Sequence, residues 1–165
     1  MNVIKSIFAL IALLFLQIFI LNNFMFEGFL NPYIYIAFIL FLPPRSSALY
    51  VLSLAFLIGA IVDVFEGAYG VHTAASVFIA FIKPLLFGVF KTGKTELSDS
   101  SEIKQLGLLR SLGFLLIGIF LHHFILFSIE NFAWDNLFQL LMRSLYSSLF
   151  SFTFVLLYQL WNYRR

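Results

Sequence analysis

Long apolar runs, separated by short polar stretches, follow one another along most of this chain. The runs cover about 4–21, 31–43, 47–65, 71–90, 107–129 and 137–161. A helix that crosses the roughly 30 Å hydrocarbon core of a bilayer needs about 20 apolar residues. Five runs are long enough; the second, as a helix, covers only part of the thickness, so it is extended at its start, tilted or partly re-entrant. The pattern predicts an all-α polytopic membrane protein with six transmembrane helices in one compact bundle, residues 1–165.

Two segments need a separate interpretation. The run at 4–21 follows Lys5 and ends at Leu21-Asn22-Asn23 without a small-x-small cleavage site, so we expect a retained helix rather than a removed signal peptide. The one sustained polar segment, 91–105, reads KTGKTELSDSSEIKQ and is too short for a domain. We expect it to be a cytoplasmic connector between the fourth and fifth spans.

Composition makes lipid the solvent for much of the chain. Hydrophobic residues make up 62% and charged residues only 11%, with a mean hydropathy of +1.00. Soluble domains are about 25% charged, so a water-soluble fold is excluded. There is no cysteine, which removes disulfides and thiolate chemistry. The net charge of +2 is too small to indicate a nucleic-acid partner.

Charge placement gives the orientation. With a cytoplasmic N-terminus, the basic residues of the cytoplasmic ends are Lys5, Arg45, Lys91, Lys94, Lys104, Arg110, Arg164 and Arg165. The charged residues of the outer connections are then all acidic: Glu27, Asp63, Glu66, Glu130 and Asp135. This is the positive-inside pattern at every loop. It predicts a multi-pass protein with both termini in the cytoplasm, and it places Tyr33 and Tyr69 in an outer aromatic belt.

Several polar groups are expected in the outer half of the membrane. A candidate cluster there comprises Asp63, Glu66, His72, His122, His123 and Arg143. A charge at the bilayer centre costs about 2.5–3.5 kcal/mol on insertion scales, so such groups usually have partners. One interpretation pairs Arg143 with Asp63 or Glu66. The other has Arg143 reach the interface while the histidines donate to backbone carbonyls.

The same residues argue against metal binding and catalysis. His122 and His123 are adjacent, so on a helix they point about 100° apart, whereas a metal site prefers a spacing of three or four. There is no HExxH, GxSxG or Walker motif and no nucleophile–base pattern. We expect no enzyme activity, no metal and no cofactor.

Small and polar residues predict helix packing. The candidate face for packing, or for a partner helix, comprises Gln17, Ser144, Ser147, Ser148 and Ser151. The serines repeat as small-xxx-small, which permits close helix contact inside or between proteins. Lys83 precedes Pro84 in the fourth run, and we expect its amine to extend toward the inner interface.

One short motif is specific enough to suggest a family. Gly59, Asp63, Gly67 and Gly70 follow the spacing G-x-x-x-D-x-x-x-G-x-x-G between the third and fourth runs, and His72 begins the next span. The glycines suit a tight turn between helices, and the acid is placed to pin it. With the six runs and the basic loop, this stretch resembles MreD, the rod shape-determining membrane protein. Ala60 departs from the family, in which leucine is common at this position.

The resemblance implies a non-enzymatic scaffold in the bacterial inner membrane. Its partners would be an MreC-like protein, a RodA-like glycosyltransferase, a penicillin-binding transpeptidase and, indirectly, the MreB-type filament. The implied fold is the six-helix bundle of substrate-binding subunits of energy-coupling-factor vitamin transporters. A small-ligand-binding transporter subunit is therefore the alternative, although Ala9 and Ala12 lack the spacing of the docking motif of that class. A channel is the weaker third interpretation, because no polar stripe crosses any span.

Overall fold

The computed structural model describes residues 3–23, 30–43, 46–91, 103, 106–130 and 136–163. The predicted connector at 91–105 lies, apart from Lys91 and Ile103, outside the described residues, as do Glu27 and Asp135. In the described part the chain forms six α-helices, and four of them are long and apolar enough to cross a membrane. The prediction of an all-α, multi-pass membrane protein is confirmed at this level.

The four long helices begin and end close to the predicted boundaries. They are α3 (Ala48–Glu66), α4 (Val71–Phe90), α6 (Leu108–Glu130) and α7 (Leu137–Tyr163). Local signals explain several of these ends. The Ser47 hydroxyl accepts from the Tyr50 amide at the start of α3, and Gly107, with φ of 73°, precedes α6.

The first run is shorter as a regular helix than the apolar pattern suggests. The helix α1 (Val3–Phe15) widens into a π-helical turn, η1 (Leu16–Ile20), and then tightens into the 3₁₀ turn η2 (Leu21–Asn23). The π-helical turn contains Gln17, whose side chain is fully buried. Such turns are often found where a helix must present a side chain at a functional or structural site.

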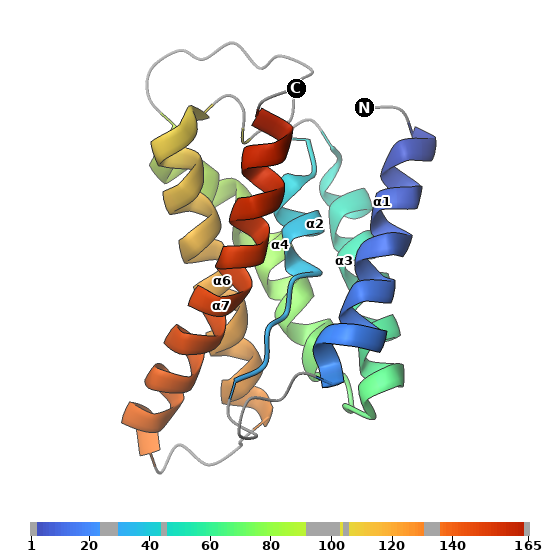
Figure 1. Cartoon of the computed structure of the whole chain (residues 1–165), viewed down its shortest axis with the longest axis vertical. Helices are drawn as coiled ribbons and strands as arrows, with labels where there is room; N and C mark the ends of the chain where they lie inside the picture. Colours follow the sequence, from blue (N-terminus) through green and yellow to red (C-terminus); the bar gives the residue numbers. More distant parts are fainter. Residues whose placement is uncertain are drawn as a thin grey trace.

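The second run is not a helix over 31–43. Residues 31–34 have no regular secondary structure, and only α2 (Ile36–Phe41) is helical. Together the two pieces run along the long axis of the bundle, and in Figure 1 the extended piece lies between α7 and α1. Ile36, Ile39 and Leu40 of α2 have no exposed surface. A chain segment surrounded by protein can leave the helical conformation at membrane depth, because its polar groups bond to protein rather than face lipid.

Successive elements alternate in direction along the long axis, and α1 begins at the end of the bundle where α7 finishes (Figure 1). The opposite end, where α3 ends and α4 begins, is called the corner end below. The outward faces are apolar: Phe8, Val64, Phe81 and Leu109 are all at least 72% exposed. This arrangement suits a bundle surrounded by lipid, with its polar side chains inside.

Candidate functional site

The turn between α3 and α4 is built by the four motif residues. Gly67 ends α3 with φ of 67°, and Gly70 begins α4 with φ of 88°; both values lie in the left-handed region that favours glycine. Gly59 serves a different purpose, since a Cβ there would lie 2.5 Å from the Thr73 Cα. It allows α3 and α4 to cross in backbone contact.

Asp63 fastens this corner. Its carboxylate accepts hydrogen bonds from the backbone amides of His72 and Thr73, both at 2.9 Å, and from the Thr73 hydroxyl. These amides belong to the first turn of α4, where they have no helical acceptor and where the helix dipole favours a negative charge. Asp63 is only 7% exposed. Among the described residues, the partners of the Asp63 carboxylate therefore come from α4, and none of them is a basic side chain.

Arg143 pairs with the acid that ends α6. Its Nη1 lies 3.1 Å from Glu130 Oε2, and its guanidinium lies 4.0 Å from the centroid of the Phe127 ring. Of the two interpretations of Arg143, the one that pairs it with Asp63 or Glu66 does not match this contact. The reason is geometric: Glu130 ends α6, the helix packed against α7, whereas Asp63 is already satisfied by α4.

A chain of hydrogen bonds joins three helices and the segment at 31–35. His72 Nε2 lies 2.8 Å from Glu66 Oε2, and His72 Nδ1 lies 3.1 Å from the Tyr35 hydroxyl. The same hydroxyl lies 2.9 Å from His122 Nε2. His72, Tyr35 and His122 are at most 2% exposed. We call Glu66, His72, Tyr35 and His122 the histidine chain.

The geometry of this chain allows two directions of donation. If Nε2 of His72 carries its only ring proton, that N–H donates to the Glu66 carboxylate, Nδ1 accepts from the Tyr35 hydroxyl, and the Tyr35 oxygen accepts from His122 Nε2–H. If both ring nitrogens of His72 carry a proton, Nδ1–H donates to the Tyr35 oxygen and the Tyr35 hydroxyl donates to His122 Nε2. His122 Nδ1 has no partner among the described residues.

The candidate cluster is thus brought together in part. Glu66 and His72 are in direct contact, His122 joins them through the Tyr35 hydroxyl, and the Asp63 carboxylate accepts from the His72 amide. His123 turns elsewhere: its Nδ1 lies 2.9 Å from the Ile119 carbonyl oxygen, one helical turn earlier, and its Nε2 lies 3.2 Å from Ser151 Oγ. His123 therefore matches the alternative of a histidine bonded to its own backbone.

The residues predicted as a packing or partner face form hydrogen bonds inside the bundle. Gln17 Nε2 donates to the Pro32 carbonyl at 3.0 Å, and its Oε1 accepts from the Ile34 amide at 2.8 Å. Two serines of α7 accept from the same segment, Ser151 from the Tyr33 amide at 2.9 Å and Ser147 from the Asn31 amide at 3.3 Å. These side chains replace the partners that a helix would give to residues 31–34.

The other two serines of the stripe bond within α7, Ser144 to the Leu140 carbonyl and Ser148 to the Leu145 carbonyl. All four serines have no exposed surface, so they are not available as a surface for another protein. Lys83 is also buried, at 3% exposure, and its amine donates to the Leu42 carbonyl at the C-terminal end of α2, 2.7 Å away. The expected extension to the interface is wrong, because this helix end offers the charge a nearer acceptor.

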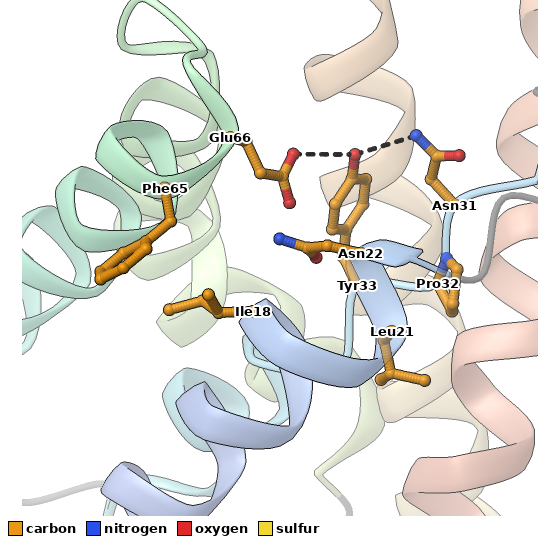
Figure 2. A pocket seen from close by; sticks show the side chains of 8 residues that line it. All are labelled: Ile18, Leu21, Asn22, Asn31, Pro32, Tyr33, Phe65 and Glu66. Carbon is orange, nitrogen blue, oxygen red and sulfur yellow. Dashed lines mark hydrogen bonds between the residues drawn. The ribbon is translucent and has the colours of Figure 1, made fainter.

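A cavity of about 270 Å³ opens beside Glu66. It lies between η1 and η2, the segment at 31–33 and the end of α3 (Figure 2). Its walls are Ile18, Leu21, Asn22, Asn31, Pro32, Tyr33, Phe65 and Glu66. The Tyr33 hydroxyl donates to Glu66 Oε2 at 3.4 Å and accepts from Asn31 Nδ2 at 3.1 Å.

Tyr33 and Tyr35 belong to the site, although neither was among the predicted site residues. Tyr33 was expected in an outer aromatic belt, but it is 4% exposed and packs among the rings of His72, His123 and Phe127. Tyr33 directly follows Pro32, and Tyr35 comes two residues later; residues two apart lie on one side of an extended segment. This spacing indicates a shared side only where the second run begins without a helix.

The site combines the histidine chain, the carboxylates of Asp63 and Glu66, and a cavity. In the described part of the chain no three His, Cys, Asp or Glu side chains are close enough to hold a metal ion. Comparisons of the chain with protein families, curated proteins and solved structures found no match in any of the three. The resemblance to MreD remains a prediction from the motif, and the site is interpreted from its own geometry.

Proposed function

We propose that this chain is a non-enzymatic scaffold of the bacterial inner membrane that serves the cell-elongation machinery, as the MreD-like motif implies. In this proposal the chain crosses the membrane six times, with the first pass made by α1 and η1 and the second by residues 31–43. Both termini are cytoplasmic, and the corner end faces outward. MreC-like and RodA-like proteins and a penicillin-binding transpeptidase are the partners, and lipid covers the remaining surface.

The observation that carries the proposal is how the motif is used. Gly59 permits the crossing of α3 and α4, Asp63 caps α4, and Gly67 and Gly70 form the turn. Each position supports the shape of the corner, and none presents a reactive group. A motif that encodes a shape suits a protein that positions other proteins.

The partner surface in this proposal is a lipid-facing helix side. The serine stripe of α7 is internal, so it is set aside. Helix α1 is the better candidate because it lies at the edge of the bundle (Figure 1) and exposes Phe8, Ile11 and Phe15, each at least 58%, along one side. Helix association in lipid depends on such packing and on a few hydrogen bonds worth about 0.6 kcal/mol each.

The test is capture of the native complex. The chain, tagged at its C-terminus and expressed at its native level, is solubilised in mild detergent, and the proteins bound to it are identified by mass spectrometry. Recovery of the MreC-like and RodA-like partners is the expected result. A photo-crosslinking residue at Phe8 should give a partner adduct, whereas the matched position Phe81, exposed on α4, serves as the control for random collision.

The alternative, a small-ligand-binding subunit of an energy-coupling-factor-type transporter, is favoured by the cavity at Glu66. The same capture separates the two functions. Recovery of a transporter ATPase with a bound vitamin, and of no cell-wall protein, would refute the scaffold.

A further inference from the structure

In the described part of its wall, the cavity at the corner end has one charged group, the Glu66 carboxylate. Only one of its two oxygens is hydrogen-bonded to the described residues. Glu66 Oε2 is engaged by His72 Nε2 and by the Tyr33 hydroxyl, whereas Glu66 Oε1 is buried and has no hydrogen-bond partner among the described residues. Figure 2 shows this second oxygen turned into the cavity, on the side of Asn22. A buried carboxylate oxygen without a donor is costly, so the site is suited to a molecule that brings one.

The other lining residues indicate the chemical class of a molecule that would fit this cavity. Among the lining residues that the structure describes, Glu66 is acidic and none is a lysine or an arginine. Ile18, Leu21 and Phe65 provide an apolar side opposite the carboxylate, and the rings of Tyr33 and Phe65 flank the approach to it (Figure 2). A cation near an aromatic face is attracted to the ring, and a charge-assisted hydrogen bond to a carboxylate is about twice as strong as a neutral one.

A metal ion fits this wall poorly. Hard cations need about six oxygen ligands, and in the described part of the lining Glu66 is the one carboxylate. A volume of about 270 Å³ lies near the lower limit of small-molecule sites, so it suits a small ligand.

We propose that this cavity binds a small organic ammonium ion, with its N–H donating to Glu66 Oε1 and its hydrocarbon part against Ile18, Leu21 and Phe65. The proposal does not depend on the scaffold role, since a scaffold and a transporter subunit could each carry such a site. The histidine chain supports it from behind, because His72 and Tyr33 hold Oε2 and thereby turn Oε1 toward the cavity.

The test uses the full chain in lipid nanodiscs and n-butylammonium chloride as the probe. Saturable binding is measured by ligand-observed NMR, with 1-butanol as the neutral molecule of matched shape. Butylammonium is expected to bind, and butanol to bind at least tenfold more weakly. Equal binding of the two, or no saturable binding of butylammonium, would overturn the proposal.

Variants locate the site. Glu66→Gln keeps the shape and removes the charge, and it is expected to weaken butylammonium binding at least tenfold. Glu130→Gln is the matched control, because Glu130 also ends a helix near the corner end but does not line the cavity. It should bind as the wild type does. An unchanged affinity in Glu66→Gln, or an equal loss in both variants, would contradict the assignment.

Two measurements keep the test independent of the folding of Glu66→Gln. Ile18→Trp fills the cavity without altering the carboxylate and should also abolish binding; unchanged binding by this variant would refute the cavity. A diazirine-bearing alkylammonium probe should label peptides containing Ile18 or Phe65 in the wild-type protein, and excess butylammonium should prevent it. Labelling spread over the lipid-facing helices and insensitive to competition would count against the site.

Discussion

Replacing Gly59 by alanine is expected to destabilise the bundle at the crossing of α3 and α4. The new Cβ would lie 2.5 Å from the Thr73 Cα and 2.8 Å from both the His72 carbonyl oxygen and the Thr73 amide nitrogen. Carbon atoms are normally about 3.5–4.0 Å apart in contact, so the helices must separate by about 1 Å. All three neighbours are backbone atoms, and no rotamer change can relieve the overlap.

The size of the effect follows from two opposing contributions. Overpacking of a well-packed interior costs typically about 1–3 kcal/mol, and contact with rigid backbone places this site at the upper end. Alanine regains about 1 kcal/mol over glycine in a helix. The free energy of unfolding should therefore fall by about 2 kcal/mol. Separation of the helices also stretches the bonds from Asp63 to α4, which adds to the loss.

The assay is reversible unfolding in mixed micelles with increasing dodecyl sulfate, and Gly88 supplies the matched control. Gly88 lies inside α4, and a Cβ there meets no atom within 4 Å. Gly88→Ala should therefore stabilise the protein by about 0.5–1 kcal/mol. The two variants have the same chemical change and opposite expected signs. If Gly59→Ala is as stable as the wild type, the close crossing of α3 and α4 is wrong.

Three further predictions use the same assay. Ser151→Ala leaves the Tyr33 amide without an acceptor, so the free energy of unfolding should fall by about 1–3 kcal/mol. Ser148→Ala loses only a bond within its own helix and should change that free energy by no more than about 0.5 kcal/mol. Equal effects of the two variants would contradict the buried extended segment. Asp63→Ala removes the acceptor for two backbone amides of α4, so the free energy of unfolding should fall by about 2 kcal/mol. Asp63→Asn should destabilise the protein less. A smaller loss of stability for alanine than for asparagine would refute the capping role. Exchanging the charges of Asp63 and Arg143 should not restore the stability lost by either single change, and recovery would reinstate their pairing.

The long helices were predictable because their information is local. A run of about 20 apolar residues can satisfy its backbone in lipid only as a helix, so α3, α4, α6 and α7 follow from length and hydropathy alone. The corner between α3 and α4 was also accessible. Gly67 and Gly70 need only their own backbone conformation to explain their presence, and that need is visible in the sequence.

The interior could not be predicted in the same way, since it depends on contacts between distant residues. The apolar pattern alone could not show that residues 31–34 leave the helical conformation, because that is possible only where Gln17 and the serines of α7 take over their backbone bonds. The roles of Ser147 and Ser151 were decided by this pairing. The choice of Glu130 over Asp63 for Arg143 was decided by the packing of α6 against α7.

Length, hydropathy and two glycines thus suffice to find the four long apolar helices and the turn between α3 and α4. Which polar side chains meet inside the bundle follows only from the packed fold. Lipid acts on each segment independently through its apolar surface, whereas a buried hydrogen bond needs two partners that the folded bundle brings within reach.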